Sequence, residues 1–127
     1  MGKSWRMAHF IVTRVVADNR MVVVLNPDFT IDHWQALEDF YQKEIAEGKL
    51  LWDLDLGQLS FINSMMLGLI VGFNTMLNSR GGEFRLLVPE HSRIGDLLTL
   101  AKLDTIINVI RYTDGVGSIA AGKTVEN

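Results

Sequence analysis

Ser64 is the residue whose type and setting offer the most chemistry in this sequence of 127 residues. It follows Asn63 in the stretch "FINSMMLGLIVG", where these two are the only polar side chains. A serine in such a place can cap a helix, act as a nucleophile or accept a phosphate. The sequence disfavours an enzyme, because no G-x-S-x-G motif surrounds Ser64 and no histidine is placed in a motif with it. A helix cap and a phosphate acceptor remain, since the free amides and the dipole at a helix start stabilise an added anion.

Two carboxylates precede this stretch. Asp53 and Asp55 alternate with apolar residues in "LLWDLDL", so both lie on one face of an expected strand. With Asn63 they offer oxygen ligands of the kind that Mg²⁺ takes. We favour a structural role, in which Asp55 accepts backbone N–H groups of the loop that leads to Ser64. The sequence therefore predicts no metal and no cofactor.

Two further signals are weaker. Residues 117–124, "GSIAAGKT", match the phosphate-binding pattern G-x-x-x-x-G-K-[ST]. Only three residues follow Thr124, so no helix can form there to hold the phosphate, and we interpret the match as a coincidence. His9, His33 and His91 have no metal-ligand spacing, because the nearest two are 24 residues apart. We expect them at the surface or partly packed.

The elements that must position Ser64 follow from hydrophobic periodicity. Alternation and turn residues predict a hairpin of strands 9–16 and 21–25, with the second strand buried on both faces. Apolar residues at helical spacing predict helices over 34–45, over 64–79 and from about Ser92. Further strands are expected over 49–56, 83–88 and 105–112. Helices that alternate with strands predict an α/β fold with a mixed sheet, largely parallel after the hairpin.

The helix that begins at Ser64 has two distinct faces. Its core stripe comprises Met66, Leu69, Ile70, Phe73 and Leu77. The opposite face comprises Leu67, Val71, Asn74, Thr75 and Asn78, and Met65, Gly68, Gly72 and Met76 form a strip beside it. Exposed apolar side chains next to a phosphorylatable serine are typical of a docking patch. A C-terminal tail that covers them is an equal alternative.

Composition narrows the class of protein. The length fits one domain with a hydrophobic core, and the absence of cysteine excludes disulfides, thiol catalysis and cysteine-bound zinc. A net charge of −3 gives no general attraction to nucleic acid or anionic membranes. The longest apolar stretch, 65–73, is too short to span a bilayer, and the N-terminus lacks the apolar segment of a secretory signal. We expect a cytoplasmic domain without membrane insertion.

Three segments together resemble a known family. They are "LWDLDLGQLSFINSMMLG", "RGGEFRLLVP" and "HSRIGDLLTLAKLDTII". They are similar to the STAS domain of bacterial anti-sigma factor antagonists, over residues 8–112 and most specifically over 50–103. The resemblance implies a single α/β domain with a four- to five-stranded mixed sheet flanked by helices, followed by a tail at 113–127 with at most a short helix.

The resemblance also implies a function. In that family a serine aligned with Ser64 is phosphorylated by an ATPase-fold anti-sigma factor that is also a serine kinase. The unphosphorylated protein binds this kinase and frees the sigma factor, and a serine phosphatase resets the switch. Asn63 and Asp55 align with acids that support the phosphosite, and partner contacts are expected at Met65, Leu67, Gly68 and Val71.

The sequence departs from the family pattern at several positions. Asn63 replaces the more usual Asp, Met65 and Met66 replace Ser-Gly, and "AKL" at 101–103 replaces Ser-Gly-Leu. The alternative is therefore a STAS scaffold or adaptor in a stress-signalling or lipid-transport complex, which works without phosphorylation.

Overall fold

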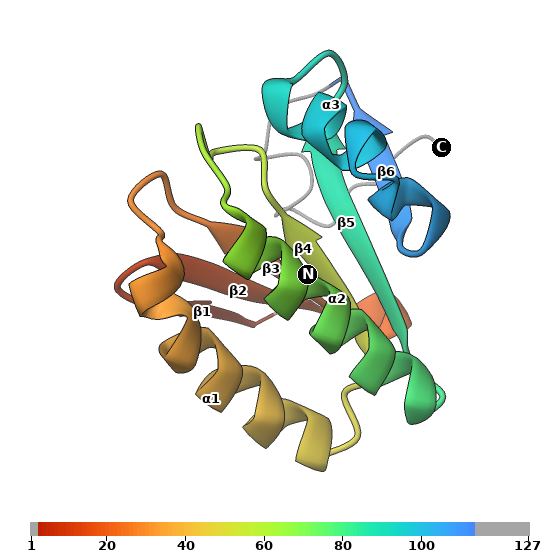
Figure 1. Cartoon of the computed structure of the whole chain (residues 1–127). Helices are drawn as coiled ribbons and strands as arrows, with labels where there is room; N and C mark the ends of the chain where they lie inside the picture. The colour runs from red at the N-terminus through yellow and green to blue at the C-terminus, as the bar shows by residue number, and fades with distance from the viewer. Residues whose placement is uncertain (1–2, 114–127) are drawn as a thin grey trace.

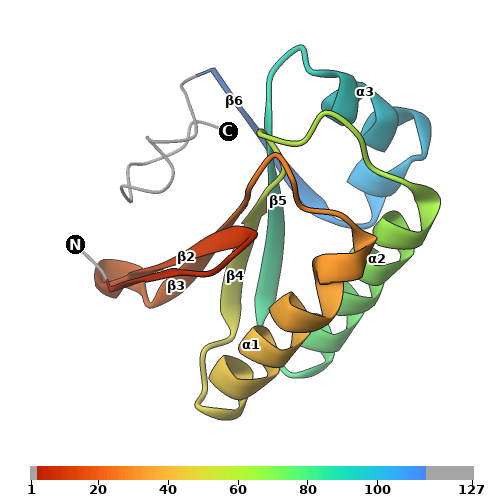
Figure 2. The same ribbon diagram turned by 90° about the vertical axis from the view of Figure 1, so that its left-hand side faces the viewer.

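In its described part the protein forms one six-stranded sheet with helices on one side (Figures 1 and 2). The computed structural model describes residues 3–113. The strands are β1 (Ser4–Arg6), β2 (Phe10–Val15), β3 (Arg20–Leu25), β4 (Leu51–Asp55), β5 (Glu83–Pro89) and β6 (Asn108–Tyr112). The α-helices are α1 (Trp34–Ala46), α2 (Ser64–Ser79) and α3 (Arg93–Leu100), and the short 3-10 helices are η1 (Val16–Asp18), η2 (Ile31–His33) and η3 (Leu103–Thr105).

The strand order across the sheet is β1-β2-β3-β4-β5-β6. β1, β2 and β3 pair antiparallel, whereas the pairs β3–β4, β4–β5 and β5–β6 are parallel. The carboxyl ends of β3, β4 and β5 therefore lie at one end of the sheet. The loop from Leu56 to Asn63, which joins β4 to α2, starts at that end (Figure 1).

Local sequence signals set the element boundaries. Asn19, with φ of 54°, takes the left-handed conformation that closes the β2–β3 connection after η1. Gly48, with φ of +90°, ends the segment after α1, because a side chain is disfavoured in that conformation. Ser92 caps α3 by accepting a hydrogen bond of 3.0 Å from the Gly95 amide.

The main core lies between the sheet and the helices. Figure 2 shows α1, α2 and α3 on the same side of the sheet. Trp52 and Leu54 of β4 face this core, where aromatic rings gather: the Phe73 and Tyr41 rings stack with their centroids 3.9 Å apart. The opposite side of the sheet carries no described helix, and we call it the helix-free face. A second apolar cluster lies there, comprising Val22, Val24, Leu87, Ile110 and Tyr112.

The predicted elements are largely confirmed. The hairpin, the three helices, the three later strands and the parallel half of the sheet are all present, and α2 has the predicted bounds 64–79. The expected count of four to five strands was too low, because the short strand β1 pairs with the edge of β2. Two residues of α2 also differ in burial from the prediction. Asn74 is buried although it was placed on the outer face, and Leu69 is only half-buried.

No helix among residues 3–113 is long and apolar enough to cross a membrane. The pattern "GSIAAGKT" at 117–124 and the tail alternative for covering α2 lie outside the described residues.

Candidate protein-binding and phosphorylation site

Ser64 is the first residue of α2, and its side chain is exposed. The preceding residue, Asn63, caps the helix, because its Oδ1 accepts a hydrogen bond of 2.8 Å from the Met66 amide. The cap role that the sequence left open for Ser64 therefore belongs to Asn63. The Ser64 hydroxyl is in none of the side-chain hydrogen bonds found within residues 3–113, so it is available at a helix N-terminus, where an anion is stabilised.

Asp55 anchors the start of the loop that leads to Ser64. Its Oδ1 accepts hydrogen bonds of 2.8 Å from both the Gly57 amide and the Tyr112 hydroxyl. The bond to Gly57 confirms the predicted structural role. Burial of the carboxyl group raises its pKa to about 6, although the two hydrogen bonds oppose this change.

The carboxylate of Asp53 forms salt bridges with two arginines. Arg20 Nη1 lies 2.9 Å from its Oδ1, and Arg85 donates from Nε to Oδ1 at 2.8 Å and from Nη2 to Oδ2 at 2.7 Å. Arg20 also binds Glu83 at 2.7 Å and lowers the pKa of that carboxyl group. Asp53 and Asp55 share the helix-free face, as predicted. Because Asp53 is paired with cations and Asn63 caps α2, these side chains are not arranged around a metal ion.

The predicted contact residues differ in exposure. Met65 is 66% exposed and Gly68 is exposed, whereas Leu67 and Val71 are half-buried against the core. Sequence reasoning missed Phe61, which is 70% exposed just before the helix cap. Phe61 stands next to Ile62 in an apolar stretch of the sequence. Nothing in that stretch distinguishes the exposed Phe61 from the buried Ile62. We call Phe61, Met65, Leu67, Gly68 and Val71 the α2 patch.

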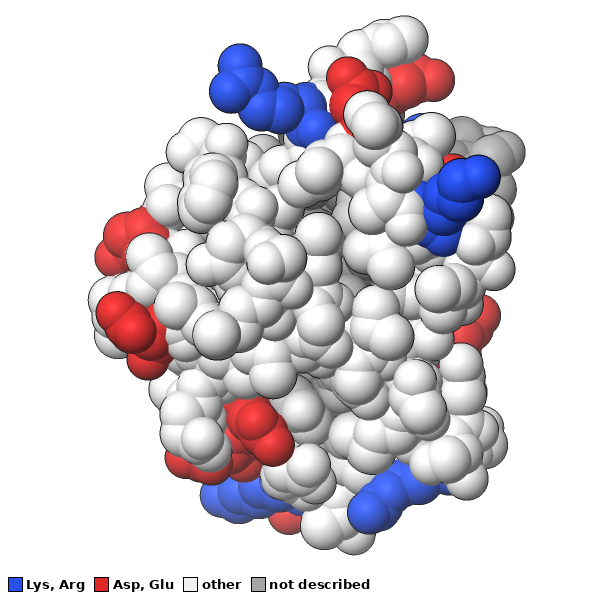
Figure 3. Space-filling model, in the orientation of Figure 1, with Lys and Arg blue, Asp and Glu red and all other residues white. Residues whose placement is uncertain are grey.

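The surface over α2 carries no charge. None of the 16 residues of α2 is Lys, Arg, Asp or Glu. In Figure 3 the charged side chains lie mainly around the rim of this face, and its centre is uncharged. An uncharged surface with exposed apolar side chains is more typical of a protein-binding face than of a solvated helix.

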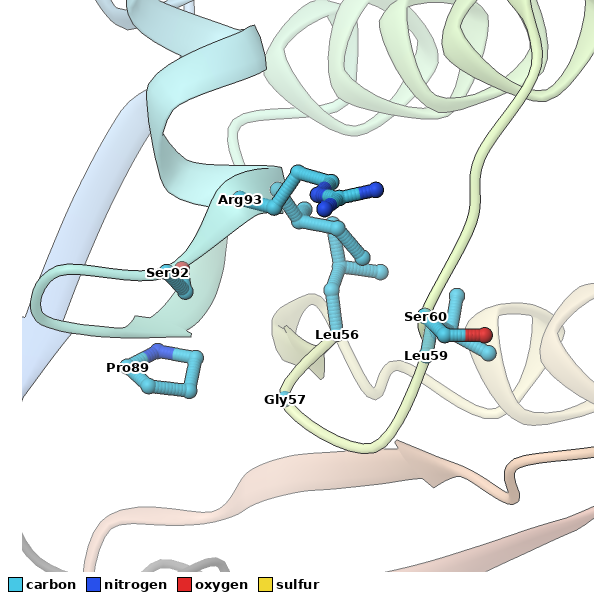
Figure 4. Close-up of a pocket in the computed structure, with 8 residues that line it drawn as sticks. Leu56, Gly57, Leu59, Ser60, Pro89, Ser92 and Arg93 are labelled. Atoms are coloured by element: carbon cyan, nitrogen blue, oxygen red, sulfur yellow. The ribbon is translucent and has the colours of Figure 1, made fainter.

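A cavity of about 370 Å³ lies beside the same loop. It is lined by residues of the loop after β4, including Ser60, and by residues around the start of α3, including Arg93. Figure 4 shows the Arg93 side chain extending from α3 toward the segment that rises from Ser60. The cavity therefore separates the loop from Leu56 to Asn63, which we call the Ser64 loop because it leads to Ser64, from α3 at the carboxyl ends of β4 and β5.

The three histidines are far apart in the sequence, but two of them are in contact in the structure. The rings of His9 and His33 stack with centroids 3.5 Å apart, and His9 Nδ1 lies 3.0 Å from Asp28 Oδ2. The Thr30 amide donates to His33 Nδ1 at 3.0 Å. Spacing in the sequence could not reveal this pair. Because parallel rings do not direct their nitrogens at one point, the pair is a packing contact rather than a metal site.

Asn63 and Ser64 should therefore respond differently to truncation. Asn63→Ala is expected to lower the free energy of unfolding by about 1 kcal/mol, because the Met66 amide loses its acceptor. Ser64→Ala should change it by less than about 0.5 kcal/mol, since its side chain is exposed. Urea unfolding followed by circular dichroism measures both. A larger loss for Ser64→Ala than for Asn63→Ala would contradict the cap assignment.

Comparison with solved structures supports the fold. The crystal structure of a Thermotoga maritima protein proposed to be an anti-sigma factor antagonist matches with a TM-score of 0.69 and 24% sequence identity, over 89% of this chain and 92% of that one. An NMR structure of the same protein matches with a TM-score of 0.66 and 23% identity, over 87% and 90%. No family model and no curated protein matches the sequence. The structural likeness confirms the predicted STAS-like fold.

Proposed function

We propose that this protein is a non-enzymatic binding module of the anti-sigma factor antagonist type. Its partner docks on the α2 patch while Ser64 is unphosphorylated, and phosphorylation of Ser64 releases it. The observation that carries the proposal is an exposed serine at the start of an uncharged helix, with Phe61 and Met65 exposed on either side of it in the chain. The partner expected from the resemblance is an ATPase-fold anti-sigma factor with serine kinase activity, and a serine phosphatase reverses the reaction.

The physical basis of the switch is desolvation. A phosphate on Ser64 adds about −1.5 to −2 charges at neutral pH. The amides at the start of α2 stabilise this charge in the free protein, so the fold itself should change little. A partner that covers the α2 patch would have to remove water from the dianion, which weakens the complex. The phosphate therefore acts on binding rather than on folding.

Substitutions at Ser64 test this proposal. Ser64→Ala is expected to bind the partner as wild type does and to resist phosphorylation. Ser64→Asp should bind about 10-fold more weakly, because one desolvated charge costs on the order of 1 kcal/mol or more. Affinities are measured by titration calorimetry with each ATPase-fold anti-sigma factor of the host organism. Intact-mass measurement of protein purified from that host, with and without phosphatase, detects the phosphate.

The alternative is a scaffold that works without phosphorylation. The exposed Met65, which takes the place of a small serine in the family pattern, favours it because a bulky side chain follows the acceptor hydroxyl directly. A scaffold predicts equal partner affinities for Ser, Ala and Asp at position 64 and no phosphate on the native protein. That combination of results would refute the switch and leave the α2 patch as a constitutive contact.

A further inference from the structure

The carboxyl group of Asp55 joins three parts of the structure. It lies at the end of β4, it accepts the Gly57 amide of the following loop, and it accepts the hydroxyl of Tyr112 at the end of β6. The side chain is buried, with 0% of the residue exposed. Gly57 fits tightly here, because a Cβ at that position would collide with the Tyr112 hydroxyl and lie 2.9 Å from Asp55 Oδ1. The Leu56 amide also donates to the Leu87 carbonyl at 2.9 Å, and the side chains of Leu56, Leu59 and Ile62 are buried in the core. The carboxyl group is therefore the ionisable one among the described contacts that hold the start of this loop.

The surroundings of Asp55 are mostly apolar. Its neighbours in register are Val24 on β3 and Leu87 on β5, both buried in the apolar cluster of the helix-free face. The second carboxyl oxygen, Oδ2, is buried and has no hydrogen-bond partner within residues 3–113. An ionised carboxylate is poorly solvated in such a site.

The charged and titratable groups on each side do not compensate for this. On its own strand, Asp53 repels the ionised form. The nearby cations of β3 and β5, Arg20 and Arg85, both bind Asp53 instead. From β6, only the Tyr112 hydroxyl reaches Asp55, and from the loop only the Gly57 amide does, among the described contacts.

We propose that Asp55 is a proton-controlled lock on the loop from Leu56 to Asn63, in which the protonated carboxyl group keeps the loop closed and ionisation favours loop opening. The lock concerns the fold itself and rests on the proposed function only for its consequence at Ser64. Ser64 is already exposed in the closed state, so opening does not uncover its hydroxyl. Opening frees the segment that precedes Ser64, and the charge of Asp55 therefore governs how readily that segment can rearrange around a modifying enzyme.

The direction follows from linkage between proton binding and conformation. Burial raises the pKa of Asp55 from its ordinary value of 3.8 to about 6 in the closed state. In an open state that hydrates the carboxyl group, the pKa returns toward the ordinary value. The extra stability of the closed state is thus fully present below pH 3.8 and is lost as the pH rises through about 6. Between pH 5 and pH 8 the open population should increase about 10-fold.

Amide hydrogen exchange in the full chain tests the lock directly. The reporters are the Gly57 amide, bonded to Asp55, and the Leu59 amide, which donates to the Leu56 carbonyl at 3.1 Å. Their protection factors, corrected for the intrinsic pH dependence of exchange, should fall about 10-fold from pH 5 to pH 8 in the wild type. The amide of Ile70, a fully buried residue on the core side of α2, reports global unfolding as the reference.

Asp55→Asn is the matched variant, because asparagine keeps the acceptor oxygen but cannot ionise. Protection of Gly57 and Leu59 relative to Ile70 should then be independent of pH. A flat wild-type profile, or the same fall in Asp55→Asn, would overturn the proposal.

Carbon-13 NMR of the Asp55 carboxyl group provides a second measurement that does not depend on how the variant folds. The wild type should titrate with a midpoint near pH 6. Tyr112→Phe removes a hydrogen bond that stabilises the ionised form, so its midpoint should move upward. A wild-type midpoint near the ordinary 3.8 would refute the lock. Neither measurement involves a partner or a phosphate, so failure here is distinguishable from failure of the Ser64 switch.

Discussion

Phe73→Glu is expected to leave the protein unfolded at 25 °C. The Phe73 ring is 3% exposed, and its centroid lies 3.9 Å from that of Tyr41 and 4.9 Å from that of Phe84. Loss of a buried phenyl ring alone costs about 3–5 kcal/mol, and an unpaired carboxylate in its place adds several more. Domains of this size are typically stable by about 5–15 kcal/mol, so little or no stability remains. Far-ultraviolet circular dichroism and near-ultraviolet signals measure the outcome.

Leu67→Glu is the control for the same chemical change on the other face of α2. Leu67 is half-buried and belongs to the α2 patch, so the carboxylate of a glutamate at this position can reach water. We expect a loss of about 1 kcal/mol in the free energy of unfolding and a folded protein that no longer binds its partner. If Leu67→Glu were also unfolded at 25 °C, the assignment of the two helix faces would be wrong.

Asp53→Ala is expected to lower the free energy of unfolding by about 3–5 kcal/mol. Removal of one member of a buried ion pair leaves the other charge without compensation. Among the described residues Arg85 loses its carboxylate partner, whereas Arg20 keeps Glu83 at 2.7 Å and Asp18 at 3.7 Å. The side chains of Asp53, Arg20 and Arg85 are only 4%, 12% and 22% exposed, so the uncompensated charge of Arg85 is poorly solvated. Urea unfolding of the variant and the wild type at pH 7 measures the difference.

Glu83→Gln provides the comparison within the same network. Glu83 binds Arg20 at 2.7 Å, but its side chain is 46% exposed, so solvent screens the interaction. We expect a loss below about 1 kcal/mol. Equal losses for Asp53→Ala and Glu83→Gln would show that burial does not determine the strength of these pairs.

Periodic patterns predicted the long elements well. The apolar spacing from Met66 to Leu77 gave the bounds of α2, and the alternation in "LLWDLDL" placed Asp53 and Asp55 on one face of β4. Patterns of this kind extend over several residues, so single exceptions do not hide them. β1 was missed because its three residues, Ser4–Arg6, are too few to show any period. It forms through pairing with β2, which is a tertiary interaction.

The residues of the candidate site could be named from the sequence, but their arrangement in space could not. Ser64, Asn63 and Asp55 were identified from the sequence, and the structure places each of them around the loop between β4 and α2. The exposure of Phe61 and the burial of Asn74 depend on how the chain turns before α2 and how α2 rotates against the sheet. The two arginines on Asp53 lie 33 and 32 residues from it in sequence, a distance over which spacing carries no information.

The order of strands across the sheet has a consequence for how the chain reaches this structure. Each strand pairs with the strand before it in the chain, so none must insert between two partners already joined. The sheet can thus grow from one edge as successive segments leave the ribosome, each closing a loop of modest length. Sheets with such sequential pairing have fewer distant contacts to search for, which favours rapid folding. β6 then completes the sheet last, and with Tyr112 it brings the final hydrogen bond to Asp55.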